Sequence, residues 1–487
     1  MSYTVASVPQ VLSRTLHKRP DAVAVVARTG SLTYRELDHR ITDAAGALWE
    51  LGVRPGDRVA ATLPNDLEVV TAFHAVMRLG AIWVGIPDAL AAPEKNRLLQ
   101  HCRPRVYLDG SAGEWAALLA NGHRAPAVAI DPHAAAGIAY TSGTTGSPKG
   151  VVHSQHNLLL PGAVLTAERG YGPDLRKGDC LPLTILNLMV LTTLLTIQAG
   201  GCAVVMDRRD ADGVVDWIRE ERPTVWNGVP TQLRDMVRRS DITCDDLASL
   251  DEVWCGGADL PDSLREEFAA KFSLPVRATY GLTEAPTIVA IDPPGADWHP
   301  GSSGIVLPHL DVGVDDHELT VTAAATGPWA HSYTPMLGHW QGDRVAPCAG
   351  VLRTGDLGTV DADGWLRVVD RRRLLIVRGG ANVYPTEVEQ VIKTVPGVAD
   401  VVVFGRPDER LGERVGAIIE PDHTSDGSAL TAEALTEHCA QALAAYKIPD
   451  TWAVVAALPR NAMGKTIRTH LLSLFDSATR LDIRSHA

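Results

Sequence analysis

Tyr140-Thr-Ser-Gly-Thr-Thr-Gly-Ser-Pro-Lys-Gly150 is the stretch of this 487-residue chain that is richest in groups able to hold a phosphate. Its glycines allow close approach of the backbone, its hydroxyls offer hydrogen-bond donors, and Lys149 supplies a positive charge. A P-loop requires glycine before the lysine and Ser or Thr after it, whereas this chain has Pro148 and Gly150 there. The stretch therefore predicts a polyphosphate clamp that is not a P-loop.

The residues on either side of this loop predict two short strands, at 137–140 and 150–153. The loop then joins two strands and does not open a helix, as a dinucleotide-binding loop would. The alternative is a flexible surface turn rich in Ser, Thr and Gly.

Strands and helices alternate on both sides of the loop, with short breaks between them. Expected strands lie at 58–63, 81–86, 203–206, 224–227, 252–255 and 276–279, and expected helices at 33–48, 67–79, 157–166, 186–199 and 211–221. Thr33 and Glu36 form a predicted capping box at the start of one helix. This alternation predicts an α/β fold with doubly wound sheets.

The pattern changes twice towards the C-terminus. From 304 to 369 short alternating runs with frequent Gly and Pro predict a small antiparallel sheet or β-barrel-like subdomain. Four charges at Asp370-Arg-Arg-Arg373 then precede a βαβ-like pattern of their own. We expect a large N-terminal domain at 1–371 and a small, mobile C-terminal α+β domain at 372–487.

Bulk composition narrows the partners and the compartment. The 45 basic and 58 acidic residues give a net charge of −13, which argues against nucleic acid or an anionic membrane as main partner. Seven widely spaced cysteines predict a reducing cytoplasm and no structural zinc. No export signal is visible, and the uncharged stretch 180–206 contains Asn, Gln and a Gly pair, so it predicts a buried helix and strand, not a membrane span.

A second polar cluster, Tyr280-Gly-Leu-Thr-Glu284, follows the predicted strand 276–279. The tyrosine can stack on a purine, the threonine can reach a phosphate oxygen, and the glutamate can bind Mg²⁺. The strand at 252–255 likewise ends in Gly256-Gly257-Ala258. Ligands of open parallel sheets bind beyond the carboxyl ends of the strands, so both stretches are expected at one crevice.

In order and spacing these stretches resemble the signatures of the adenylate-forming superfamily, which includes acyl-CoA synthetases, nonribosomal-peptide adenylation domains and firefly luciferases. The resemblance covers nearly the whole chain. It implies catalytic roles for Lys465, Thr283 and Glu284, with Glu284 also as the Mg²⁺ ligand. The ATP and AMP contacts that it implies are Thr141, Ser142, Gly143, Thr144, Thr145, Lys149, Gly257, Ala258, Tyr280, Gly281, Asp356 and Arg371.

The resemblance also implies that the small domain rotates between two half-reactions. Arg373 matches the hinge, and Gly379 and Gly380 match the channel for the pantetheine arm of coenzyme A. Lys465 lies far along the chain from Lys149, so only a domain that folds back can bring both lysines to one ATP. Asp356 matches the ribose contact, although by itself it is equally typical of a hairpin turn.

Four positions depart from the family pattern. Thr184 and Ile185 stand where the family often has an aromatic-His pair, or an aspartate in amino-acid-activating relatives. Their presence predicts a wide apolar acyl pocket, to which Gly257 and Gly281 also belong, and an acid without an α-amine. Gln155 replaces a common histidine, so neither His153 nor His156 inherits a role. Val377 replaces a second functional lysine of luciferases, which argues against light emission.

The sequence thus predicts an ATP-dependent carboxylic acid:CoA ligase that uses ATP, Mg²⁺ and coenzyme A and forms an acyl-AMP intermediate. One alternative is an acyl-AMP ligase that loads the pantetheine of a carrier protein in trans. Another is a non-catalytic nucleotide-binding scaffold, against which the presence of Lys465, Glu284 and Asp356 together argues.

Overall fold

The computed structural model describes residues 5–110, 114–141, 149–257, 260–295, 298–348, 350–371, 374–378, 381–408, 410–422, 430–461, 466–468 and 471–481. The chain forms two compact units. The first contains Met1–Val312, Thr320–Leu352 and Ala362–Leu366, and the second contains Gly313–Leu319, Arg353–Asp361 and Arg367–Ala487. The predicted boundary between 371 and 372 stays a prediction, because residues 372 and 373 lie outside the described ranges.

The first unit is built on a nine-stranded sheet with the order β14-β13-β12-β11-β10-β8-β9-β1-β2. Its strands are β1 Val23–Ala27, β2 Gly30–Thr33, β8 Arg176–Asp179, β9 Cys202–Val205, β10 Val225–Gly228, β11 Glu252–Gly256, β12 Val276–Leu282, β13 Thr287–Ile291 and β14 Ile305–Val306. The six strands from β12 to β1 pair in parallel. The carboxyl ends of β8, β10, β11 and β12 therefore share one edge of the sheet.

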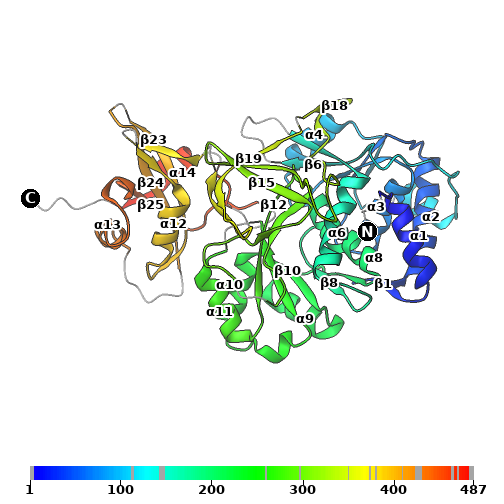
Figure 1. The fold of residues 1–487 in the computed structure, drawn as a ribbon, viewed down its shortest axis with the longest axis horizontal. Coiled ribbons are helices and arrows are strands. Elements are labelled where there is room, and N and C mark those ends of the chain that lie inside the picture. The colour runs from blue at the N-terminus through cyan, green and yellow to red at the C-terminus, as the bar shows by residue number, and fades with distance from the viewer. Residues whose placement is uncertain are drawn as a thin grey trace, which may run out of the picture. The chain divides into compact units, whose positions relative to one another are not determined.

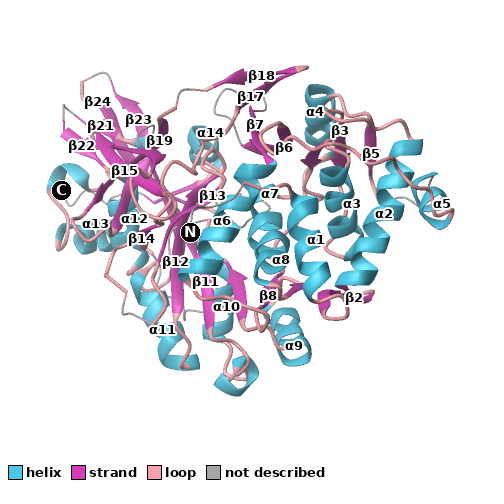
Figure 2. Ribbon diagram, turned by 45° about the vertical axis from the view of Figure 1, so that its right-hand side comes forward, coloured by secondary structure: helices cyan, strands magenta, loops and turns pink. Residues whose placement is uncertain are grey.

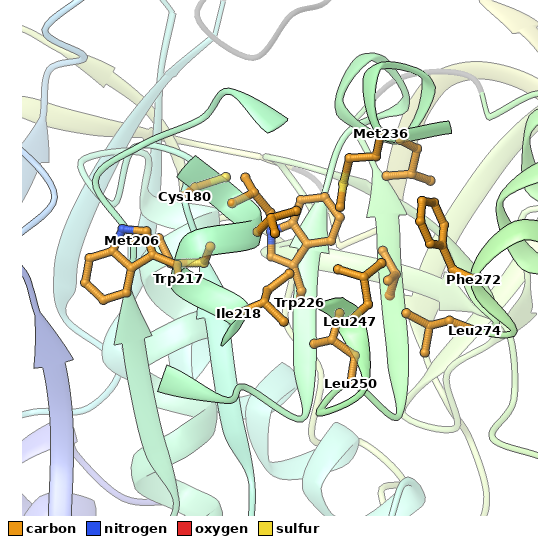
Figure 3. Packing of buried hydrophobic residues seen from close by; sticks show 14 of the residues in the cluster. Cys180, Met206, Trp217, Ile218, Trp226, Met236, Leu247, Leu250, Phe272 and Leu274 are labelled. Atoms are coloured by element: carbon orange, nitrogen blue, oxygen red, sulfur yellow. The ribbon is translucent and has the colours of Figure 1, made fainter. Parts of the chain in front are cut away.

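Alternating side chains cover the two faces of this sheet. Trp226 on β10 packs in a buried cluster with residues of α9 (Ala211–Glu221), α10 (Pro230–Arg238) and α11 (Asp262–Phe272), which Figure 3 shows from close by. Its neighbour Val225 and Trp254 on β11 point to the other face, where α6 (Gln155–Glu168) packs. Both faces bury large apolar side chains, although β8 instead carries the buried charged residues Lys177 and Asp179.

A second sheet of the first unit has seven strands in the order β18-β17-β7-β6-β4-β3-β5. Its strands are β3 Arg58–Ala61, β4 Ile82–Gly85, β5 Val106–Leu108, β6 Ala135–Thr141, β7 Lys149–Ser154, β17 Gly338–Gln341 and β18 Arg344–Pro347. Helices α1 (Val8–Lys18), α3 (Leu67–Arg78), α6 and α8 (Leu195–Ala199) lie side by side (Figure 2). The remaining helices of this unit are α2 Tyr34–Glu50, α4 Ala92–Cys102 and α5 Glu114–Ala120. The predicted doubly wound α/β fold is confirmed.

Local chemistry explains both the agreements and the differences along the chain. Thr33 and Glu36 do form the predicted capping box of α2, with the Thr33 N–H donating to Glu36 Oε2 at 2.8 Å. The predicted helix 186–199 is instead α7 (Leu186–Met189), a π-helical turn (Val190–Leu194) and α8. Two threonine hydroxyls of this segment donate hydrogen bonds where the helix is irregular. Thr192 Oγ1 donates to Asp179 Oδ2, and Thr193 Oγ1 donates to the Met189 carbonyl.

Residues 304–369 supply strands to three sheets, which the sequence did not indicate. Strands β15 Leu310–Asp315, β16 Glu318–Ala323, β19 Leu352–Val360 and β20 Leu366–Arg371 form a four-stranded sheet in that order. Strand β14 extends the nine-stranded sheet, and β17 and β18 extend the seven-stranded one. Alternation along a strand shows which face is buried but not which partner strand it meets.

The last part of the chain forms a mixed sheet in the order β22-β21-β24-β25-β26, with β23 paired to β24 (Figure 1). Its elements are β21 Ile376–Arg378, β22 Ala381–Val383, α12 Pro385–Lys393, β23 Val398–Asp408, β24 Gly412–Pro421, α13 Ala432–Ala440, β25 Thr451–Val454, α14 Leu471–Ser477 and β26 Thr479–Leu481. Val401 and Val403 pack with α12 and α13, while Val402 and Phe404 pack with α14. The predicted α+β pattern is confirmed.

Among the helices in the described ranges, none combines the length and the apolar composition needed to cross a membrane.

His74 on α3 is a buried histidine whose ring nitrogens have no hydrogen-bond partner among the described residues. Burial lowers the pKa of its imidazole to about 3, against about 6.5 in an unfolded chain. Between about pH 6.5 and 4 the unfolded chain therefore binds a proton that the folded chain does not, so the free energy of unfolding falls as pH falls.

We expect His74→Leu to reduce the fall in the free energy of unfolding by about 1.4 kcal/mol per pH unit between about pH 6 and 4. Urea unfolding followed by tryptophan fluorescence measures it, with His39→Leu on the exposed face of α2 as matched control. Equal pH slopes for the wild type and His74→Leu would contradict the prediction.

Candidate active site

Two antiparallel strands flank the phosphate-loop stretch, as predicted. Thr141 at the end of β6 and Lys149 at the start of β7 are directly paired. Lys149 is exposed and Thr141 is half-buried. The other proposed phosphate contacts of this loop lie outside the described residues; they are Ser142, Gly143, Thr144 and Thr145.

Tyr140 is held in place at the entrance of the loop. Its hydroxyl oxygen lies 2.8 Å from Nδ1 of His101 on α4, and the two rings meet edge to face. Burial raises the pKa of the Tyr140 phenol, so the hydroxyl keeps its proton at neutral pH. No local pattern in the sequence predicts this contact, which fixes the last residues of β6.

The two glycine-containing turns of the nine-stranded sheet lie on neighbouring strands. Gly256 at the end of β11 is paired with Thr279 on β12, directly before Tyr280. Gly257 is exposed and has φ of +76°, a conformation that glycine adopts without strain. Tyr280 is half-buried, and Ala258 lies outside the described residues. Gly257 and Tyr280 therefore do share one edge of the sheet.

Residues 283–286 form the turn between β12 and β13 and carry the proposed catalytic pair, Thr283 and Glu284, both half-buried. A register shift follows Tyr280, where the pairing passes from Tyr280↔Ala290 to Gly281↔Ile288. On the far side of the turn, buried Thr287 has φ of +86°, which is strained for a β-branched residue. Bulges and strained residues often lie beside functional sites.

The backbone of this turn is also anchored from the seven-stranded sheet. The Thr283 carbonyl oxygen lies 2.7 Å from Nε2 of His153 on β7. The Glu284 carbonyl accepts a hydrogen bond of 3.0 Å from the Met336 N–H. Burial lowers the pKa of the His153 imidazole to about 4, so the ring is neutral at pH 7.

The Glu284 carboxylate suits the Mg²⁺ that the sequence predicts. It is half-buried and has no hydrogen-bond or ion-pair partner within the described part of the chain. Mg²⁺ commonly takes one or two carboxylates and completes its octahedron with phosphate oxygens and waters. A single half-buried carboxylate without a partner in the described residues fits that pattern.

Thr184 and Ile185, the proposed acyl-pocket residues, follow a segment that is fixed at its backbone. Asn65 Oδ1 accepts from the Leu183 N–H at 2.9 Å, and Asn65 Nδ2 donates to the Leu181 carbonyl at 2.8 Å. Asp179 Oδ1 accepts from the Leu181 N–H, and burial raises the pKa of Asp179 to about 6. Thr184 is buried and Ile185 half-buried, so Ile185 is the more accessible of the two.

The remaining proposed residues belong to the second unit or lie outside the described residues. Asp356 is buried on β19, and its N–H donates to Thr354 Oγ1 at 3.0 Å. Arg371 ends β20, and Arg373, Gly379, Gly380 and Lys465 lie outside the described residues. The roles assigned to these six residues stay predictions.

His153 and Asn157 are the residues at this site that sequence reasoning missed. Asn157 Nδ2 lies 3.4 Å from His153 Nδ1 and donates to the Pro335 carbonyl at 2.9 Å. The one available signal was a histidine directly after Val151 and Val152, two strand residues whose apolar side chains predict burial. Its partner is 130 positions away, which no local pattern reveals.

A polar hollow elsewhere on the first unit contains none of these residues. It is lined by Arg28, Arg208, Asp216, Trp217, Arg219 and Glu220. Each of its arginines is already paired with a carboxylate, in the pairs Arg28–Asp207, Arg208–Asp216 and Arg219–Asp246. Its positive charge is therefore neutralised, and it gives no reason to place a substrate there.

Comparison with known proteins gives matches over nearly the whole chain. The family model "AMP-binding enzyme" matches residues 12–327, and "AMP-binding enzyme C-terminal domain" matches 387–465. A long-chain-fatty-acid–CoA ligase of Mycobacterium tuberculosis, FadD13, is 32% identical over 90% of this chain and 92% of its own. A feruloyl-CoA synthase of Amycolatopsis is 32% identical over 92% of this chain and 95% of its own.

Among solved structures, the anthranilate CoA ligase AuaEII in complex with anthranoyl-AMP superposes with a TM-score of 0.86. The two chains are 25% identical over 97% of this chain and 98% of that one. The predicted resemblance to adenylate-forming enzymes is confirmed.

Gly281 is a position of the candidate site that has no room for a side chain. A Cβ atom there would lie 1.9 Å from the carbonyl oxygen of Thr287, on the backbone of the neighbouring strand. We expect Gly281→Ala to cost about 1–3 kcal/mol in the free energy of unfolding, because β13 must shift.

Gly172 provides the matched control, because a Cβ atom there would meet nothing within 4 Å. Urea unfolding of both variants measures the difference. A Gly281→Ala variant as stable as Gly172→Ala would contradict the close packing of β12 on β13.

Proposed function

This chain belongs to the family of AMP-binding enzymes, and from that premise we propose that it is an ATP-dependent ligase joining a carboxylic acid to coenzyme A. A carboxylate oxygen attacks the α-phosphorus of ATP, the bond to the β-phosphate oxygen breaks, and pyrophosphate leaves. The thiol of coenzyme A then attacks the acyl carbon of the acyl-AMP, giving a thioester and AMP and losing the thiol proton.

The observation that carries this proposal is the link between the phosphate-loop strands and the Thr283–Glu284 turn. β7 leaves the loop at Lys149, and His153 on the same strand contacts the Thr283 carbonyl. The strand that begins at Lys149 is thus tied to the turn that carries the Thr283 hydroxyl and the Glu284 carboxylate, the groups proposed to meet a nucleoside triphosphate. Such transfers depend on positioning and on neutralising charge, which these groups supply.

Each residue would have a separate role. The Thr283 hydroxyl would donate to the α-phosphate, and Tyr280 would stack on adenine. Glu284 would hold Mg²⁺, which when bound neutralises charge on the phosphates. Asp356 and Arg371 would bind the ribose, and Lys465 would bridge the carboxylate and the α-phosphate.

The acid that fits best is bulky, apolar and without an α-amine. Ile185 is uncharged and half-buried, so it offers contact area but no partner for an ammonium group. Its segment is held by Asn65, which argues that the pocket wall is preformed. Coenzyme A is the proposed thiol, and a carrier-protein pantetheine is the second candidate.

The cytoplasm is the proposed location. All seven cysteines are free thiols, and five of them are buried among apolar side chains. Free buried thiols agree with a reducing compartment, where disulfides rarely persist.

Pyrophosphate release from ATP across a panel of carboxylic acids, with and without coenzyme A, tests the proposed function. We expect release with bulky apolar acids, and thioester only when the thiol is added. Binding of ATP without pyrophosphate release from any acid would favour the scaffold alternative. Thioester formed only on an added carrier protein would favour the second candidate.

Lys465→Ala tests the separation of the two half-reactions. We expect acyl-AMP formation to fall by about 10²–10³, the size of losing one contact made in the transition state. Thioester formation from supplied acyl-AMP should stay comparatively intact, and single-turnover assays of each step measure this. Equal loss in both steps would contradict the role assigned to Lys465.

Ile185→Trp tests the placement of the acyl pocket. A larger side chain at this half-buried position should exclude large acids more than small ones, by about 1–3 kcal/mol of transition-state binding. Comparison of kcat/KM for a long and a short acid measures the effect. A uniform loss for both acids would remove Ile185 from the pocket.

A further inference from the structure

His153 makes a hydrogen bond whose direction is fixed by chemistry. Its Nε2 lies 2.7 Å from the carbonyl oxygen of Thr283, 130 positions along the chain. A carbonyl oxygen only accepts hydrogen bonds, so Nε2 must carry the proton and donate it. The side chain is fully buried, so water does not compete for this carbonyl.

Asn157 orients the other side of the imidazole ring. Its Nδ2 faces His153 Nδ1 at 3.4 Å and also donates to the Pro335 carbonyl at 2.9 Å. Its Oδ1 accepts from the hydroxyls of Ser154 and Thr334. Because Nδ1 faces an N–H donor, the ring is held in the tautomer that donates from Nε2.

A second hydrogen bond ties the same turn to the segment that leads into β17. The Met336 N–H donates to the Glu284 carbonyl at 3.0 Å, and the next N–H, of Leu337, donates to the Val152 carbonyl at 2.8 Å. Gly338 on β17 is paired with Val152 on β7. The Thr283 carbonyl is therefore anchored on β7, and the Glu284 carbonyl is anchored on Met336, whose neighbour Leu337 donates to β7.

We propose that His153 is a positioning residue, which holds the Thr283–Glu284 peptide in the orientation that adenylate formation requires. The peptide unit is planar, so fixing the Thr283 carbonyl fixes the plane that joins the two Cα atoms. Thr283 and Glu284 then project their side chains in set directions. The inference rests on the proposed function, in which these side chains meet the α-phosphate and Mg²⁺.

His153 acts through Thr283 and not on substrate directly. One ring nitrogen donates to the Thr283 carbonyl and the other faces Asn157. A displacement of about 1 Å in a reacting group can cost about 10²-fold in rate, which sets the scale of the effect.

His156 supplies a matched control, because its hydrogen bond goes to a residue outside the proposed active site. It is also buried, it lies in the first turn of α6, and its Nε2 lies 2.6 Å from the carbonyl of Ser332. Ser332 is not one of the proposed active-site residues. Replacing His153 or His156 by Leu thus removes a buried hydrogen bond to a carbonyl in each case, but only replacement of His153 affects Thr283.

The test compares His153→Leu, His153→Gln and His156→Leu in the full chain. We expect His153→Leu to lower kcat for acyl-AMP formation about 10- to 100-fold, with little change in KM for ATP. Thioester formation from supplied acyl-AMP should change less than threefold. His153→Gln places an amide N–H near the carbonyl, so it should restore most of the rate. His156→Leu should leave the ratio of the two half-reactions unchanged.

Hydrogen–deuterium exchange of a peptide spanning 280–286 gives a readout that needs no activity. We expect faster exchange in His153→Leu than in the wild type or His156→Leu, and protection restored in His153→Gln. If His153→Leu does not fold, Thr334→Val replaces it in the exchange measurement. This variant removes a hydroxyl that donates to Asn157, the residue that orients the His153 ring.

Unchanged exchange in this peptide, or equal loss of both half-reactions, would overturn the positioning role. A wild type that forms no acyl-AMP from any acid would instead overturn the proposed function, and the exchange data would still decide the positioning role.

Discussion

The hydrogen bond from His153 to the Thr283 carbonyl is the interaction on which the site of the first unit depends. It joins β7 of the seven-stranded sheet to the turn that ends β12 of the nine-stranded sheet. Under the proposed function, each sheet would supply part of the groups that meet the phosphates of ATP. A buried, uncharged donor suits this task, because it holds a backbone carbonyl without placing another charge beside the substrate.

The helix that follows this contact packs on the nine-stranded sheet. Buried apolar side chains lie on both faces of that sheet, with Trp226 facing α9–α11 and Trp254 facing α6. α6 itself begins directly after β7, with Ser154 as its N-cap. The cap, the histidine and the helix that covers the sheet are thus consecutive in the chain. A shift of α6 on the sheet would move the donor away from Thr283.

Much of the fold and part of the site could be predicted from the sequence, for a physical reason. Glycines, hydroxyls and Lys149 gather locally at Tyr140–Gly150, so their chemistry is visible in one stretch. The His153 contact joins residues 130 positions apart, and only the folded chain brings them together. The π-helical turn at Val190–Leu194 was missed because it depends on Thr192 bonding to Asp179. Because Gln155 departs from the family pattern, the sequence assigns no role to the histidines on either side of it, His153 and His156.

The tautomer of His153 is the most direct test of this account. Long-range proton–nitrogen correlation spectra of the full chain labelled at histidine nitrogens, with His153→Gln for assignment, would measure it. The account predicts a neutral ring at pH 7 with the proton on Nε2. A ring protonated on Nδ1, or on both nitrogens, would contradict it, because the geometry then leaves no donor assigned to Thr283 or no acceptor for Asn157.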